Sequence, residues 1–286
     1  MRSEDTTRPG APAGHRWTWR TVLLAFAVAY GTYAAARWLG AGEGAAHANA
    51  GHVVDLERAL GLDVEGPVQR AFDAPAAVWI LNHLYMAAQF LVVPAALLLV
   101  RHASVPAFRR LRDVLLLTWV LATPVNAFFP VAPPRMAGIG VTDTITASGS
   151  SALTSGLSTA LYNPLAAVPS LHVAFAFTVG IAIVMTFRSR VLRTIGALWG
   201  PVITLAVVAT GNHYVVDAVA GVALAACSYG LLRLPAPRPA LGRLAARPSL
   251  PAAATLVRAG TAVGAAWAAV PLVPHGGSGH RTTTGH

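Results

Sequence analysis

The chain has 286 residues, of which 55% are hydrophobic and 11% charged, with a mean hydropathy of +0.57. Soluble domains carry about 25% charged residues, so this balance excludes an ordinary soluble protein and indicates a membrane protein. The formal net charge of +10 rests on arginine, because the chain has no lysine, and this excludes Schiff-base and P-loop chemistry. Cys227 is the only cysteine, which excludes an internal disulfide and a cysteine metal cluster.

The N-terminal part combines a polar tail with an apolar run. Residues 1–16 are polar and contain Pro and Gly, which predicts a disordered tail. The apolar run 17–39 predicts the first membrane span. A cleaved signal peptide is the alternative, because Ala48-Asn49-Ala50 resembles a cleavage site. We favour a retained helix, because that site lies well beyond the apolar run.

The next segment, residues 40–76, is rich in acidic side chains and poor in arginine. Within it, Val53, Leu56, Leu60 and Leu62 suggest a helix, and either Gly61 or Gly66-Pro67 provides a stop. This pattern predicts a short amphipathic helix that lies on the surface of the bilayer.

Five further apolar runs approach the roughly 20 residues needed to cross a bilayer. They cover residues 77–100, 114–131, 168–187, 194–210 and 212–232. Together with the first run they predict an all-α polytopic protein, with a six-helix transmembrane bundle over residues 17–234. The Pro/Ala/Arg-rich region 235–286 follows, and its weakly apolar piece 250–273 is compatible with an extra span, a surface helix or disorder.

Arginine placement predicts the orientation of the spans. The positive-inside rule places basic segments in the cytoplasm. These segments are 1–20, 101–112, 188–193 and 233–247, and they alternate with the basic-poor segments 40–76 and 132–167. The alternation requires an even number of spans before residue 233, which agrees with six. We therefore expect a multi-pass plasma-membrane protein with a cytoplasmic N-terminus. Because the arginines form no single patch, we expect membrane lipids and no nucleic acid as partners.

Three motifs lie at the predicted outer ends of their segments. They are Pro133-Pro134-Arg135, Pro169-Ser170-Leu171-His172, and Gly211-Asn212-His213-Tyr214 with Asp217. Motifs far apart in the sequence thus converge on one membrane surface, which predicts an outward-facing active site.

Asp217 is the most informative of these residues. It is the only acid after Asp143 and lies in an apolar run, where a carboxylate needs a partner. His213 lies four residues earlier, on the same face of a helix. A carboxylate that accepts one imidazole N–H leaves the other ring nitrogen free as a nucleophile. The alternative is a structural pair that only holds helices together.

The other candidate residues suit phosphate chemistry. His172 would protonate a leaving oxygen, since its ordinary pKa lies near neutrality. Pro169 fits the first turn of a helix, so Ser170 would lie among free N–H groups that attract phosphate. The guanidinium group of Arg135 would bind phosphate oxygens. As alternatives, Ser170 would only cap the helix, and Arg135 would only reach lipid headgroups. The spacing of the histidines and Asp217 does not require a metal.

At these motifs the chain resembles the type 2 phosphatidic acid phosphatase superfamily, and in particular its inositolphosphotransferase branch, which includes inositol phosphorylceramide synthases. Pro130 to Arg135, Val168 to His172 and Gly211 to Gly221 are similar to its three signatures. The resemblance implies a phosphohistidine intermediate at His213, oriented by Asp217, with His172 as the general acid. The chain departs from the general superfamily pattern at two points. It has Val207 where the third motif of the superfamily has an arginine, and it lacks the lysine of the first motif.

These observations predict an enzyme without cofactor that breaks a lipid-linked phosphate ester and transfers the phosphoryl group to water or an alcohol. A transporter with a His–Asp proton relay is the alternative. Transporters hold such groups near the midplane, often within repeats. Here the groups lie at helix ends and no repeat is visible, which favours the enzyme.

Overall fold

The computed structural model describes residues 19–39, 42–147, 163 and 165–234 of the protein. The chain divides into two units, Met1–Leu234 and Pro235–His286, and the described helices belong to the first. The predicted tail at 1–16 and the possible helix at 250–273 lie outside the described residues.

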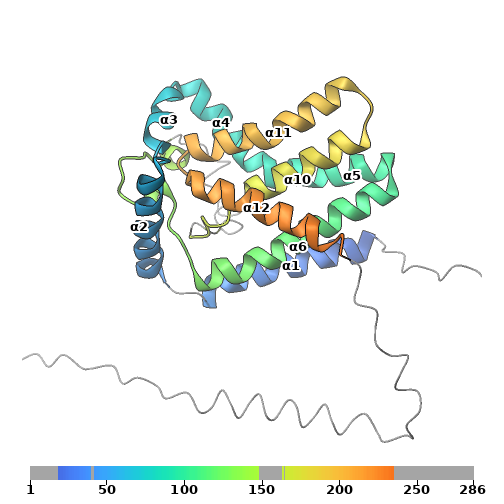
Figure 1. The fold of residues 1–286 in the computed structure, drawn as a ribbon, viewed down its shortest axis with the longest axis horizontal. Coiled ribbons are helices and arrows are strands. Elements are labelled where there is room, and N and C mark those ends of the chain that lie inside the picture. The colour runs from blue at the N-terminus through green and yellow to red at the C-terminus, as the bar shows by residue number, and fades with distance from the viewer. Residues whose placement is uncertain (1–18, 40–41, 148–162, 164, 235–286) are drawn as a thin grey trace, which may run out of the picture. The chain divides into compact units, whose positions relative to one another are not determined.

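Long helices lie side by side in the first unit, in agreement with the all-α prediction (Figure 1). They are α1 (Trp19–Leu39), α4 (Pro75–Ala87), α5 (Val93–Ala103), α6 (Val105–Phe128), α10 (Leu171–Thr186), α11 (Arg190–Ala209) and α12 (Val215–Leu231), and a π-helical turn (Ala88–Val92) joins α4 to α5. The other described helices are α2 (Glu43–Leu60), α3 (Glu65–Ala71), α7 (Thr144–Ala147) and a 3-10 turn (Pro134–Met136).

Three of the described helical stretches are long and apolar enough to cross a membrane. They are Pro75–Ala103, Val105–Phe128 and Arg190–Ala209, and α10 and α12 are apolar but shorter. These helices support a membrane-associated protein. The count of six spans and the position of α2 on the bilayer surface stay predictions.

The third predicted span has a wrong start. It was expected at residue 114, but α6 begins at Val105, directly after α5. The Ser104 hydroxyl oxygen accepts the Ala107 N–H at 3.3 Å, and Pro106 occupies the first turn, where its missing N–H costs nothing. The arginines at 109, 110 and 112 therefore belong to the helix and not to a loop. Hydropathy did not assign these arginines to the helix, because it detects only the apolar part of a helix.

Two of the four hydrophobic clusters among the described residues join α1 and α2 to the rest of the bundle. In the middle, Trp119 of α6 makes edge contacts with Phe26, Tyr30 and Tyr33 of α1, at ring-centroid distances of 6.2 to 6.3 Å. At one end, Val53 and Val54 of α2 pack in a cluster with Tyr214. Helix α2 is thereby joined to the residues that precede α12.

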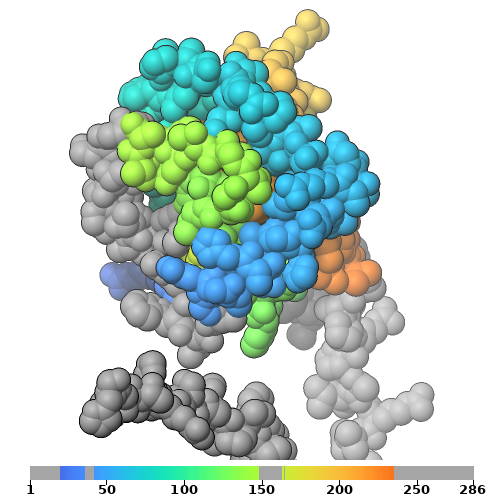
Figure 2. Space-filling model, turned by 90° about the vertical axis from the view of Figure 1, so that its left-hand side faces the viewer, coloured from blue at the N-terminus to red at the C-terminus, as the bar shows by residue number. Residues whose placement is uncertain are grey.

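The two ends of the bundle differ in composition. The α5–α6 and α10–α11 connections, with Arg101 and Arg188, lie at one end, while α2 and α3 lie at the other, where α12 begins (Figure 1). Figure 2 shows α2, α3 and the segment around residues 130–147 covering this second end. All three sequence motifs lie near it.

Candidate active site

His213 is positioned by the turn that ends α11. The Asn212 N–H binds the Val207 carbonyl and the Gly211 N–H binds the Val208 carbonyl, which is a Schellman motif. Gly211 has φ +69°, and an added Cβ would lie 2.5 Å from Val141 Cγ1, so only glycine fits. His213 thus precedes α12, and the prediction that it shares a helix face with Asp217 was wrong.

The His213 ring has two neighbours on its Nδ1 side. Nδ1 lies 2.9 Å from the carbonyl oxygen of Ala167 and 3.5 Å from Asp217 Oδ2. The backbone around the Ala167 carbonyl is held in place. The Ala167 N–H donates to the Val131 carbonyl at 3.3 Å, beside the isolated parallel bridge between Val131 and Ala166. A carbonyl only accepts, so Nδ1 carries a hydrogen, and in the neutral ring Nε2 is the nitrogen with the lone pair.

Asp217 is fully buried in the first turn of α12. Its Oδ2 accepts the Tyr214 N–H at 2.9 Å, so the carboxylate caps the helix that contains it and also faces His213. The predicted His213–Asp217 pair is therefore brought together, but the Ala167 carbonyl is the nearer partner of the imidazole.

His172 and Ser170 lie at the start of α10. Ser170 is the N-cap, and its hydroxyl oxygen accepts the Val173 N–H at 3.3 Å. Pro169 lies before the helix, so its predicted place in the first turn was wrong. The His172 ring lies over Tyr85 at a centroid distance of 4.2 Å and 5.9 Å from the His213 ring.

Close contact between α10 and α12 sets the distance between the two histidines. The Ser170 N–H donates to the Asp217 carbonyl at 3.1 Å. A Cβ added at Gly221 would lie 2.4 Å from the Ser170 carbonyl oxygen, so glycine is what lets α12 approach α10.

Arg135 occupies the 3-10 turn and is almost buried. Its backbone N–H donates to the Gly211 carbonyl at 3.0 Å, which ties the first motif to the third. Its Nε lies 3.7 Å from Asp143 Oδ1, and 5% of its side chain is exposed. The acidic neighbour was not anticipated from the sequence.

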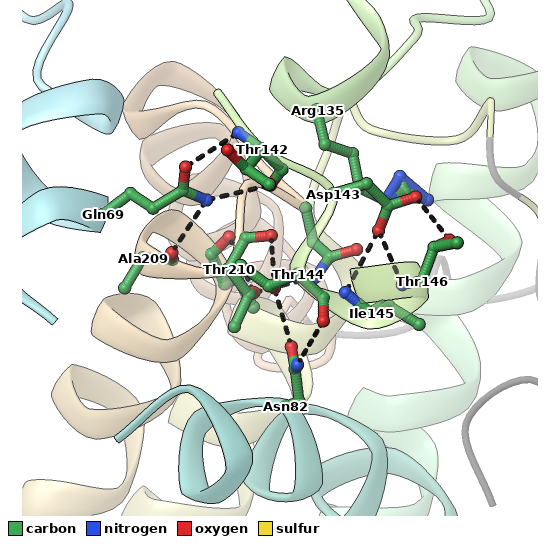
Figure 3. Close-up of polar contacts among 12 residues, drawn as sticks. Gln69, Asn82, Arg135, Thr142, Asp143, Thr144, Ile145, Thr146, Ala209 and Thr210 are labelled. Atoms are coloured by element: carbon green, nitrogen blue, oxygen red, sulfur yellow. Dashed lines mark hydrogen bonds and ion pairs between the residues drawn. The ribbon is translucent and has the colours of Figure 1, made fainter. Parts of the chain in front are cut away.

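The segment that contains Asp143 is held by amides from α3 and α4 (Figure 3). Gln69 accepts the Thr142 N–H at 2.8 Å and donates to the Thr142 carbonyl at 3.0 Å. Asn82 donates to the Thr144 carbonyl at 3.0 Å, and the Thr144 hydroxyl donates to the Thr210 carbonyl at 3.2 Å. These contacts connect the acid beside Arg135 to the end of α11.

Two buried carboxyl groups complete the start of α12. Glu65 accepts the Val215 N–H at 3.0 Å and Glu57 accepts the Val216 N–H at 2.8 Å. Burial raises the pKa of Glu57 to about 8; the Val216 hydrogen bond acts against this, and the charge of Glu65 adds to it. The sequence pattern predicted a surface location for these acids. The missed signal is that Glu57 follows Val53 and Val54 by four and three residues, on the buried face of α2.

Both site histidines line one cavity of about 510 Å³ between α1, α5 and α10. Among the described residues, no group of three or more His, Cys, Asp or Glu side chains is placed to hold a metal ion. The expectation of a metal-free mechanism stays a prediction.

Comparison with protein-family models gave a match to the PAP2 superfamily over residues 51–231. The chain belongs to the PAP2 superfamily. The match begins in α2 and ends with α12, so it includes all three motifs. No curated protein and no solved structure matched in the parallel comparisons. Membership supports phosphatase-type chemistry on lipid phosphates in general. The inositolphosphotransferase branch stays a prediction.

Proposed function

We propose that this PAP2 superfamily member transfers phosphoryl groups from lipid-linked phosphate esters through a phosphohistidine at His213. The observation that carries the proposal is the short contact between His213 Nδ1 and the Ala167 carbonyl. It selects the tautomer whose Nε2 lone pair is available for attack on phosphorus. The buried Asp217 carboxylate, 3.5 Å away, then supports the positive charge that the ring gains.

The reaction proceeds in two steps. In the first, the His213 Nε2–P bond forms and the P–O bond to the lipid alcohol breaks, while His172 donates a proton to the leaving oxygen. In the second, an acceptor oxygen attacks phosphorus, its proton passes to His172, and the N–P bond breaks. The acceptor is water or a sugar-like alcohol such as inositol.

Phosphate oxygens are bound by Ser170 and Arg135 in this proposal. The Ser170 oxygen already accepts an N–H, but its hydroxyl hydrogen remains as a donor. Arg135 supplies a permanent positive charge beside the Gly211 turn, and Asp143 orients its guanidinium.

The test is a rapidly quenched reaction with a ³²P-labelled lipid phosphate. Wild type is expected to show acid-labile protein-bound phosphate, and His213→Ala is expected to show none and no turnover. His83→Ala is the matched control, since His83 stacks on Trp79 and does not line the cavity of the site. Near-normal turnover by His213→Ala in detergent would exclude the phosphohistidine and leave the proton-relay transporter as the better hypothesis.

The general-acid role has its own readout. Without His172, an ester with a poor leaving group is expected to react slowly, whereas an aryl phosphate needs little proton donation. His172→Ala should therefore be partly rescued by 4-nitrophenyl phosphate, and His213→Ala should not. Equal losses on both substrates would contradict the assignment.

We also propose that the site faces outward in the plasma membrane, with the N-terminus in the cytoplasm. The support is the arginine distribution between the two ends of the bundle. In a Cys227→Ser background, Ala147→Cys should react with an impermeant maleimide in intact cells, and Ala103→Cys should react only after lysis. Both positions are exposed in the structure. The reverse labelling pattern would overturn the orientation.

A further inference from the structure

The cavity beside the histidines is lined mainly by apolar side chains, and its polar lining includes Gln89, Asn163 and Asn212. Its lining follows one face of α4 to α5 at a spacing of four residues, through Tyr85, Gln89, Val93 and Leu97. At 1.5 Å per residue this face is about 18 Å long. A second stripe comes from α1, through Val22, Phe26 and Tyr30. The histidines lie at the Tyr85 end, since the His172 ring contacts the Tyr85 ring in a tilted arrangement.

Gln89 is the one amide side chain that the α4 to α5 stretch contributes to this wall. Its Oε1 is buried and has no hydrogen-bond partner among the described residues. A buried polar atom without a partner costs free energy, so such atoms in native proteins usually receive a donor from water or from a ligand. Gln89 lies one helical turn from Tyr85, between the histidine end of the cavity and its apolar remainder.

The local backbone explains why Gln89 is displayed there. Pro94 has no N–H and its ring is directed against the carbonyl four residues earlier, which disturbs regular α-helical bonding. The chain forms a π-helical turn over Ala88–Val92 just before it. Such turns widen a helix locally and are frequent at functional sites.

We propose that this cavity binds the single hydrocarbon chain of a lipid phosphate, and that Gln89 selects lipids with a hydroxyl or amide N–H between phosphate and chain. The proposal rests on the proposed function, because it assumes that the phosphate lies at His213. The volume of about 510 Å³ lies within the range of about 300–1,000 Å³ that is usual for small-ligand sites. The apolar lining requires a chain, and the Gln89 oxygen requires a donor.

Chain binding is tested with hexadecyl phosphate and butyl phosphate, which differ only in chain length. Wild type should prefer hexadecyl phosphate, and Leu97→Trp should reduce this preference in kcat/KM at least about tenfold by filling the far end. Leu99→Trp is the matched control, since Leu99 is 42% exposed and does not line the cavity. An unchanged chain-length preference in Leu97→Trp would overturn chain binding in this cavity.

The role of Gln89 is tested with palmitoyl lysophosphatidic acid, which has a free hydroxyl near phosphate, and hexadecyl phosphate, which has none. Gln89→Leu should lower the kcat/KM ratio of the first lipid over the second about tenfold, as expected for the loss of one buried hydrogen bond. Gln89→Asn, with the same amide on a shorter stem, should recover part of the ratio. A ratio equal to that of wild type would overturn the selection.

Binding to an inactive protein separates this proposal from the proposed function. Radiolabelled hexadecyl phosphate should bind His213→Ala, and binding should weaken at least about tenfold when Leu97→Trp is added. If His213→Ala turns over substrate while Leu97→Trp still weakens binding, the phosphohistidine is wrong and the cavity assignment stands. Binding that is insensitive to Leu97→Trp would overturn the cavity assignment alone.

Discussion

Helices α10 and α12 each begin beside one of the two site histidines, yet their first N–H groups are satisfied in different ways. The start of α10 is capped by its own Ser170, which accepts the N–H three residues further on. The start of α12 has one local acceptor, Asp217, and two distant ones. Glu65 and Glu57 reach it from positions 150 and 159 residues earlier than the N–H groups they bind.

This difference separates two functions of a helix cap. A local cap determines where a helix begins, because its side chain takes the place of the carbonyl acceptor that the first N–H groups of a helix lack. A distant cap also determines where the helix lies, because the acceptor belongs to another element. Helices α2 and α3 are therefore part of the site, although no side chain of theirs lines the cavity.

The largest expected effect comes from the local acid of α12. Asp217→Asn keeps the size of the side chain and removes the charge that faces His213. We expect kcat to fall by about 10³ to 10⁴, as for the orienting aspartate of hydrolase triads. Quenched-flow kinetics with the labelled lipid should show slower phosphorylation of His213. A loss below about tenfold would mean that the Ala167 carbonyl alone orients the ring.

The next effect sharpens the difference between the two helix starts. Glu57→Leu leaves the Val216 N–H buried without an acceptor, and should lower the free energy of unfolding by about 1–3 kcal/mol. Glu57→Gln is the matched control, because its amide oxygen still accepts that N–H. Thermal unfolding in detergent should place Glu57→Gln near wild type. Equal losses in both variants would show that the charge matters and the hydrogen bond does not.

A pH series should reveal the same carboxyl group. Burial raises the pKa of Glu57 from its ordinary 4.5 to about 8. Below pH 4.5 the folded and unfolded states both hold the proton, and the contribution to stability is complete. Between 4.5 and about 8 the folded state holds more protons, so stability falls as pH rises, by at most about 1.4 kcal/mol per unit. Unfolding midpoints of wild type should therefore decline against Glu57→Gln across this window. Parallel curves would contradict the raised pKa.

The smallest effect belongs to the start of α10. Ser170→Ala removes the hydroxyl that accepts the Val173 N–H, and typical N-caps contribute about 1 kcal/mol. We expect a stability loss of this size by thermal unfolding. A larger loss in kcat/KM, beyond what destabilisation explains, would identify the hydroxyl as a phosphate donor. Ser170→Thr keeps the hydroxyl and should retain activity.

Site residues whose side-chain type is unusual in its sequence context were predictable, whereas contacts that depend on the fold were not. Asp217 stood out because an acid in an apolar run needs a partner, and the structure does place His213 and the start of α10 around it. The Ala167 carbonyl escaped prediction because every residue has a carbonyl, and only the fold decides which one reaches His213. The spacing from Val53 and Val54 could have placed Glu57 on the buried face of α2, but its partner is a backbone N–H far along the chain, which only the fold decides.

The same division applies to the fold. Apolar runs predicted the helical class, because hydropathy reports burial in protein or lipid directly. The start of α6 was missed by nine residues, because helix capping by Ser104 and Pro106 extends the helix through a charged stretch. The π-helical turn before Pro94 gave no periodic signal, since it covers only five residues.

The distant caps of α12 also bear on how the protein is made. Synthesis runs from the N-terminus, so the ribosome completes Glu57 and Glu65 long before the N–H groups of Val215 and Val216. Until then the two carboxyl groups lack these partners, and their burial is unfavourable. A chain that ends before Val215 would therefore lack the two N–H donors that Glu65 and Glu57 bind in the complete fold. The caps of α12 thus join the first acidic helices of the chain to its last described helix only when both are present.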